Sequence, residues 1–75
     1  MMDAFIGNIR ITEDDLDLLE RLANMDGKNG TVYVHDAQIY GALKRNGYIE
    51  SNASGWSWGT NRLRAFLSTL REFID

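Results

Sequence analysis

The strongest local pattern in the sequence is an amphipathic helix that follows Thr60. Apolar residues recur there at i, i+3, i+4, i+7, i+10 and i+11, namely Leu63, Phe66, Leu67, Leu70, Phe73 and Ile74. This spacing places them on one face of a helix, and Thr60 is a suitable N-cap residue. Because such a face is stable mainly when other elements cover it, the preceding residues are expected to fold against this helix.

The size and composition of the chain favour one small folded domain over residues 1–75. Hydrophobic residues make up 44% and charged residues 25% of the chain, as in ordinary globular proteins. There is no cysteine, so no disulfide supports the core, which is compatible with a reducing cytoplasm. Neither a signal peptide nor an apolar run long enough to span a membrane is recognisable, so we expect a soluble cytoplasmic protein without membrane contacts.

A second helix is expected earlier in the chain, at residues 13–25. Thr12 can accept a hydrogen bond from the backbone N–H of Asp15, and acidic residues in the first turn suit the positive end of the helix dipole. Leucines at helical spacing follow, and the glycine-containing segment 26–30, DGKNG, indicates the end of the helix. Upstream, the apolar residues within 5–11 predict a short strand or a packed arm.

The middle of the chain predicts a mixture of strands and a short helix. Residues 31–34, TVYV, favour an extended strand. A capping aspartate opens a helix over residues 36–46, in which Gly41 costs up to about 1 kcal/mol relative to alanine. The segments 48–51, YIES, and 56–59, WSWG, flank a glycine-containing turn and predict a β-hairpin. The expected fold is therefore α+β, in the order helix, strand, helix, β-hairpin, helix.

This order of elements resembles a reduced winged helix, with one helix fewer between the first strand and the hairpin. Residues 43–50, LKRNGYIE, are similar to a pattern in small prokaryotic and phage winged helix-turn-helix proteins, where a basic pair precedes Gly-Leu-Ile-Glu and a hairpin. Residues 59–65, GTNRLRA, match the closing part of that pattern loosely. The sequence departs from it at Gly59 and Leu63, where the pattern has leucine and glycine. The resemblance covers residues 12–74 and implies a winged-helix-like fold.

One function that the resemblance implies is a DNA-binding transcriptional regulator. The helix over residues 36–46 would then enter the major groove of double-stranded DNA, with the hairpin on the backbone or in the minor groove. The solvent face of that helix offers side chains able to contact bases or phosphates, namely Gln38, Tyr40, Lys44 and Arg45. However, the hairpin tip over residues 51–55 has no lysine or arginine, Glu50 precedes it, and the chain carries a net charge of −3.

Protein binding is the function that these charges favour. The 13–25 helix carries an acidic stripe suited to docking on a basic protein surface, formed by Glu13, Asp14, Asp17 and Glu20. Compensation of the helix dipole and solubility also explain the acidic residues of the first turn. We therefore expect a small phage or mobile-element protein that docks on a host nucleic-acid-processing complex in the bacterial cytoplasm and inhibits it, as anti-CRISPR proteins do. The oligomeric state is left open.

The two tryptophans are candidates for either the core or an interface. Trp56 and Trp58 are two residues apart, so a regular strand places them on the same side of a sheet. At least one of them is expected to close the core against the last helix. An exposed tryptophan would instead be a strong interface anchor, because this residue type is enriched among binding hot spots, and Trp56 is the candidate anchor.

Catalysis, a metal site and a cofactor are not expected from the residue types. His35 is the only histidine, and without cysteine neither a Cys–His nucleophilic pair nor a multi-histidine metal site can be formed within one chain. Residues 26–30 lack the ligand spacing of a calcium loop, and no serine or threonine follows Lys28, as a phosphate-binding loop requires. This segment is expected to form a tight turn.

Overall fold

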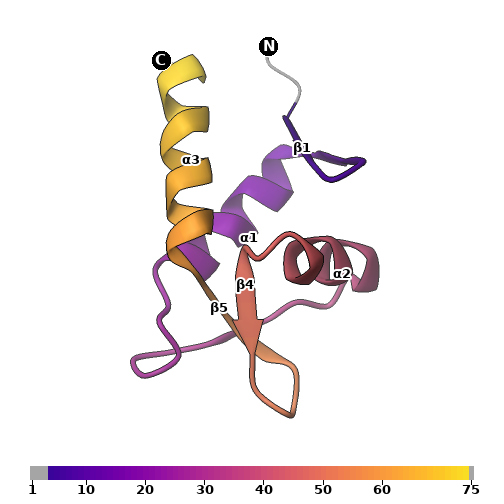
Figure 1. The fold of residues 1–75 in the computed structure, drawn as a ribbon, viewed down its shortest axis with the longest axis vertical. Coiled ribbons are helices and arrows are strands. Elements are labelled where there is room, and N and C mark those ends of the chain that lie inside the picture. The colour runs from indigo at the N-terminus through magenta and orange to yellow at the C-terminus, as the bar shows by residue number, and fades with distance from the viewer. Residues whose placement is uncertain (1–3, 75) are drawn as a thin grey trace.

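A computed structural model describes residues 4–74 of the protein, apart from the side chains of Phe73 and Ile74. The elements in chain order are β1 (Ala4–Ile6), β2 (Ile9–Ile11), α1 (Glu13–Ala23), β3 (Val32–Tyr33), α2 (Ala37–Arg45), β4 (Ile49–Ser51), β5 (Trp56–Gly59) and α3 (Asn61–Ile74) (Figure 1). The fold class is α+β, as predicted. From α1 onward, the order of the elements also agrees with the expectation.

The N-terminal segment differs from the expectation of one strand or arm, because it forms the hairpin β1–β2. The two strands are antiparallel, with Ala4 opposite Ile11 and Ile6 opposite Ile9. Gly7 has a φ of 62°, a left-handed conformation that glycine adopts without steric cost and that a two-residue turn requires. Ile6 and Ile11 point inward and join the hydrophobic core.

Helix α1 begins as predicted and ends two residues earlier than expected, at Ala23. Thr12 and Asp15 form a reciprocal capping box, in which the Thr12 N–H donates to Asp15 Oδ2 at 2.9 Å. At the other end, the N–H of Asn24 still donates to carbonyl oxygens of the last turn. Beyond it, the Met25 side chain lies against Gly30, so Met25 belongs to the following turn and not to the helix.

The second sheet has three antiparallel strands in the order β3, β5, β4. In the register, Ser57 of β5 lies opposite Val32 of β3 and opposite Ser51 of β4. Ser57 is fully buried, and its hydroxyl is satisfied by Ser51 Oγ at 2.8 Å and the Gly55 carbonyl at 3.2 Å. This side of the sheet is therefore its inner face, and alternation along β5 places the two tryptophans on the outer face.

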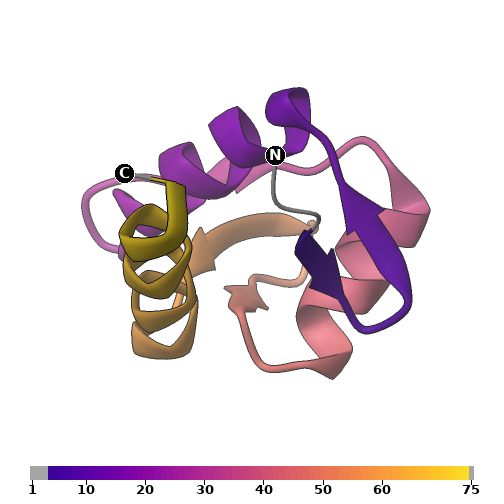
Figure 2. The same ribbon diagram turned by 90° about the horizontal axis from the view of Figure 1, so that it is seen from above.

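The hydrophobic core lies between the inner face of the sheet and the three helices, which surround the strands in Figure 2. Leu22 of α1, Leu43 of α2 and Leu63 of α3 are all completely buried. Strand β5 approaches α1 closely at Gly59, where an added Cβ would lie 2.7 Å from the Leu22 carbonyl oxygen. Glycine at the end of β5 is therefore what allows the sheet to contact the backbone of α1.

Among residues 4–74, the helices are too short or too polar to cross a membrane.

Candidate functional site

The outer face of the three-stranded sheet carries a cluster of exposed aromatic side chains. Tyr33 and Trp56 are cross-strand partners, with ring centroids 5.5 Å apart and planes inclined by 63°. The His35 ring meets Tyr33 edge-on at 4.9 Å. Tyr33 is 43% exposed and Trp56 46% exposed, so two large aromatic side chains lie side by side at the surface. We refer to Tyr33, His35 and Trp56 as the aromatic face.

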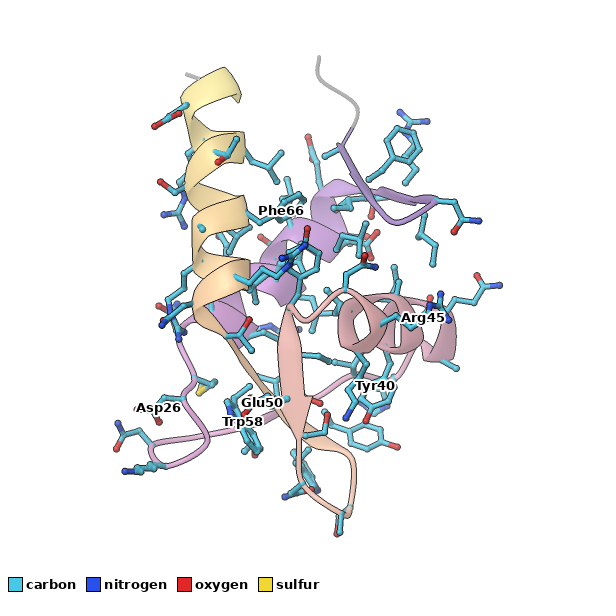
Figure 3. All side chains as sticks on the ribbon, viewed as in Figure 1. Asp26, Tyr40, Arg45, Glu50, Trp58 and Phe66 are labelled. Carbon is cyan, nitrogen blue, oxygen red and sulfur yellow. The ribbon has the colours of Figure 1, made fainter. Side chains whose placement is uncertain are left out.

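Trp58 lies on the same side of β5 as Trp56, as predicted, but serves a different purpose. It is half-buried, and its indole covers Gly27, where an added Cβ would lie 2.8 Å from the ring. Its cross-strand partner is Glu50, which is exposed next to it (Figure 3). Neither tryptophan belongs to the core, so the expectation that one of them closes it against the last helix is wrong. On β5 the side chain that points inward is that of Ser57, which lies between the two tryptophans.

The acidic residues predicted as a docking stripe are all exposed on α1, namely Glu13, Asp14, Asp17 and Glu20. They are not equivalent, because Glu20 Oε1 accepts a hydrogen bond from Arg71 Nη2 of α3 at 3.1 Å. Within the described residues, Glu13, Asp14 and Asp17 form no ion pair. The negative charge that a partner would meet is therefore concentrated at the N-terminal half of the helix.

The acidic stripe and Trp56 do not form one surface. Trp56 begins β5 and thus lies next to the turn of the β4–β5 hairpin. In Figure 1 this turn is at the bottom of the molecule, whereas α1 lies in the upper half, between α3 and the N-terminal hairpin. The residues predicted to bind a protein partner are therefore divided between two separate surfaces.

The four residues predicted to contact DNA from α2 are not equally available. Gln38, Lys44 and Arg45 are exposed. Tyr40 is half-buried, and its hydroxyl donates to Ser51 Oγ at 3.1 Å, inside the polar network under the sheet. In Figure 3 Tyr40 lies below α2, toward the β4–β5 hairpin, whereas Arg45 lies level with the helix. Because its hydroxyl is bonded to Ser51 and its side chain is half-buried, Tyr40 is the least available of the four residues.

The tip of the β4–β5 hairpin is held by its own polar groups. Asn52 Oδ1 accepts hydrogen bonds from the N–H groups of Ser54, at 2.9 Å, and Trp56, at 3.1 Å. These bonds fix the turn that places Trp56 at the start of β5. The tip, residues 51–55, carries no lysine or arginine that could contact a phosphate.

The segment DGKNG forms the tight turn that was predicted. The Asp26 carboxylate accepts hydrogen bonds from the backbone N–H groups of Asn29, at 2.7 Å, and Lys28, at 3.0 Å. These bonds favour the charged carboxylate and lower the pKa of Asp26 below its ordinary value. Within the described residues, no group of three or more histidine, aspartate or glutamate side chains is arranged to hold a metal ion.

Neither Tyr33 nor His35 was predicted from the sequence as a contact residue: partial packing in the core was favoured for Tyr33, which the structure leaves 43% exposed, and His35 was expected only to end a strand. The alternation of TVYVH places both of them on one side of an extended chain. That signal is too short to indicate which side is exposed. The pairing of β3 with β5 is what brings Tyr33 beside Trp56.

Comparisons of the chain with protein-family models, with curated proteins and with solved structures give no match.

Proposed function

We propose that this protein is a non-enzymatic protein-binding module that uses the aromatic face as its main contact surface. The supporting observation is the adjacent, nearly half-exposed pair of Tyr33 and Trp56. Adjacent exposed aromatic rings are typical of surfaces that become buried in a complex, and tyrosine and tryptophan dominate binding hot spots. Each ring limits the motion of the other, so little conformational entropy is lost when a partner binds.

The partner that fits this surface carries basic side chains. Glu50 is exposed beside the aromatic face, on the strand next to Trp58. An arginine or lysine of the partner can stack on the Trp56 indole while a second basic side chain pairs with Glu50. The net charge of −3 and the exposed acidic residues of α1 favour approach to a basic protein.

In its fuller form, the proposal is that the partner is a host nucleic-acid-processing complex and that the protein inhibits it, as anti-CRISPR proteins do. Such complexes hold phosphate backbones on basic surfaces, so an acidic protein with an aromatic anchor is suited to occupy one of them. The interpretation of the fold as a reduced winged helix rests on the order α1, β3, α2, β4–β5, α3, and the assignment to a phage rests on the size of the chain and on the resemblance of residues 43–50 to small phage proteins.

The proposal is tested by affinity capture from a bacterial lysate with the tagged protein, with and without nuclease. A stoichiometric protein that survives nuclease treatment is expected. Trp56→Ala should abolish its capture, whereas the matched variant Phe5→Ala should retain it, because Phe5 is similarly exposed, at 51%, but lies on the N-terminal hairpin. Circular dichroism verifies that both variants are folded. Equal capture by Trp56→Ala and the unmodified chain would contradict the aromatic face as the contact surface.

The acidic part of α1 is tested separately with Asp17→Lys. Asp17 is exposed and has no ion pair within the described residues, so reversing its charge leaves the packing unchanged. Glu20→Lys is a less specific variant, because it also breaks the contact with Arg71. If α1 contributes long-range attraction, Asp17→Lys should slow association and make it less dependent on salt. Unchanged association rates would leave the aromatic face as the sole contact.

A second candidate function is DNA binding through α2. It is favoured by the exposed side chains of Gln38, Lys44 and Arg45, which form no hydrogen bonds within the described residues. Here the double variant Lys44→Ala with Arg45→Ala should lose DNA affinity, and binding by the unmodified protein should fall steeply with salt. Binding to double-stranded DNA that is absent or independent of salt would dismiss this function.

A further inference from the structure

A groove lies between the turn of the N-terminal hairpin and helix α2. It has a volume of about 330 Å³ and is lined by Asn8, Ile9, Ala37, Gln38, Gly41 and Arg45. Figures 1 and 2 both show the hairpin alongside α2. Two of these residues come from the hairpin and four from α2. The groove and the aromatic face share no residue.

Among the described residues, the side chains that line the groove include one cation, Arg45, and no carboxylate. Within the described residues, the side chains of Asn8, Gln38 and Arg45 form no hydrogen bonds. Asp36 directly precedes Ala37 of the groove and caps α2. Its Oδ1 accepts hydrogen bonds from the N–H groups of Gln38, at 2.9 Å, and Ile39, at 3.2 Å. The Arg45 guanidinium is therefore available to a negatively charged ligand.

Gly41 forms part of the wall of the groove, and the fold does not require a glycine there. Its φ is not positive, and an added Cβ would meet only Arg45 Nη1, at an ordinary contact distance of 3.7 Å. A glycine inside a helix costs up to about 1 kcal/mol relative to alanine. Neither backbone conformation nor packing offsets this cost. What the glycine does provide is space in the groove, directly beside the guanidinium.

We propose that this groove binds a small organic oxyanion. Arg45 would hold a carboxylate or phosphate group through paired N–H donors, and the amides of Asn8 and Gln38 would bond to the polar body of the ligand. Ile9 and Ala37 offer apolar contact. The volume is at the lower end of ligand sites, which span roughly 300–1,000 Å³. It suits a molecule of the size of a nucleoside monophosphate or smaller, rather than a folded partner.

The proposal is tested by titrating the ¹⁵N-labelled full chain and following its amide signals by NMR. The probes are inorganic phosphate, adenosine monophosphate and succinate, which separate a phosphate from a carboxylate source. Saturable shifts are expected at the Gly41 amide and at the side-chain amides of Asn8 and Gln38 for at least one probe. No saturation by any of the three probes, up to tens of millimolar, would overturn the proposal.

Two variants identify the cation that is responsible. Arg45→Ala should weaken binding by about tenfold or more, because it removes a hydrogen bond between charged groups. Lys44→Ala is the matched control, since it removes the same charge from the same helical turn, but Lys44 Nζ lies toward the Tyr40 ring, 6.0 Å from its centroid. The affinity of the Lys44→Ala variant for the probe should stay within about twofold of that of the unmodified chain. Equal losses in both variants would indicate unspecific attraction and overturn the proposal.

A larger side chain at position 41 fills the groove, so its effect on ligand affinity can be compared with its effect on stability. Gly41→Leu should weaken binding by about tenfold or more without lowering the melting temperature, because leucine is a better helix former than glycine. If the leucine variant does not fold, Gly41→Ala narrows the same wall by one methyl group. Unchanged affinity in the filled variant would overturn the proposal. So would shifts produced only by a short DNA duplex and requiring both Lys44 and Arg45, which would assign the groove to nucleic-acid contact.

Discussion

Tyr33 and Trp56 lie directly opposite each other on β3 and β5, and their rings meet edge to face with centroids 5.5 Å apart. Both rings remain more than two-fifths exposed. The contact orders the two side chains without burying them, because both lie on the outer face of the sheet, away from the inner face that holds the buried Ser57. The outer face of the sheet therefore presents a pre-organised aromatic surface.

This pair should contribute a measurable coupling energy. In a double-mutant cycle of Tyr33→Ala and Trp56→Ala, followed by urea unfolding, we expect a coupling of about 0.5–1 kcal/mol, as for other cross-strand aromatic pairs. The control cycle of Phe5→Ala with Trp56→Ala joins residues of two different sheets. It should be additive within about 0.5 kcal/mol. The absence of coupling between Tyr33 and Trp56 would show that the rings are not held by each other.

Two glycines should respond to alanine in opposite directions. Gly59→Ala should destabilise the protein by roughly 1–3 kcal/mol, because the new methyl group would lie 2.7 Å from the Leu22 carbonyl oxygen. Gly41→Ala should stabilise it by up to about 1 kcal/mol, because it improves helix propensity and meets no obstacle. Urea unfolding of both variants measures the two changes. A stabilising Gly59→Ala would contradict the close contact between β5 and α1.

Large-to-small substitutions in the core should be costly in proportion to burial. Leu43 is completely buried, so Leu43→Ala should cost about 2–5 kcal/mol. Complete burial of Phe66 would imply a loss of about 3–5 kcal/mol for Phe66→Ala. In the structure Phe66 is only half-buried, beside Tyr48 at 5.1 Å, so a smaller loss is expected. Thermal unfolding compares the two variants, and a larger loss for Phe66→Ala would contradict this assignment of burial.

Asp26 should make the turn sensitive to acid. Hydrogen bonds from the Asn29 and Lys28 N–H groups lower its pKa in the folded protein. Its contribution to stability is therefore fully present above the pKa of an unfolded aspartate, about 3.9, and is lost as the pH falls through the lowered value. Following the Asp26 carboxyl carbon by NMR should give a midpoint below about 3.9. A midpoint at or above that value would show that the turn does not favour the carboxylate.

Much of the helical structure could be predicted from the sequence because the interactions that define it are local. The capping box of Thr12 and Asp15 and the cap from Asp36 to Gln38 and Ile39 span at most three residues. The N-terminal hairpin was less visible, although Gly7 followed by asparagine is a favourable turn dipeptide. Strands of three residues provide too little alternation to distinguish a hairpin from a single strand.

The amino-acid sequence by itself determined the fold class, the order of the elements from α1 onward, and the shared side of Trp56 and Trp58. Only the tertiary structure decided which side chains are exposed to solvent. The Trp58 indole packs against Gly27, and the groove brings the N-terminal hairpin next to Gly41. Both contacts join residues that are far apart in the chain. Such contacts depend on how whole elements pack, and local propensity carries no information about that packing. For this reason the candidate binding surfaces followed from the fold, whereas the helices that support them followed from the sequence.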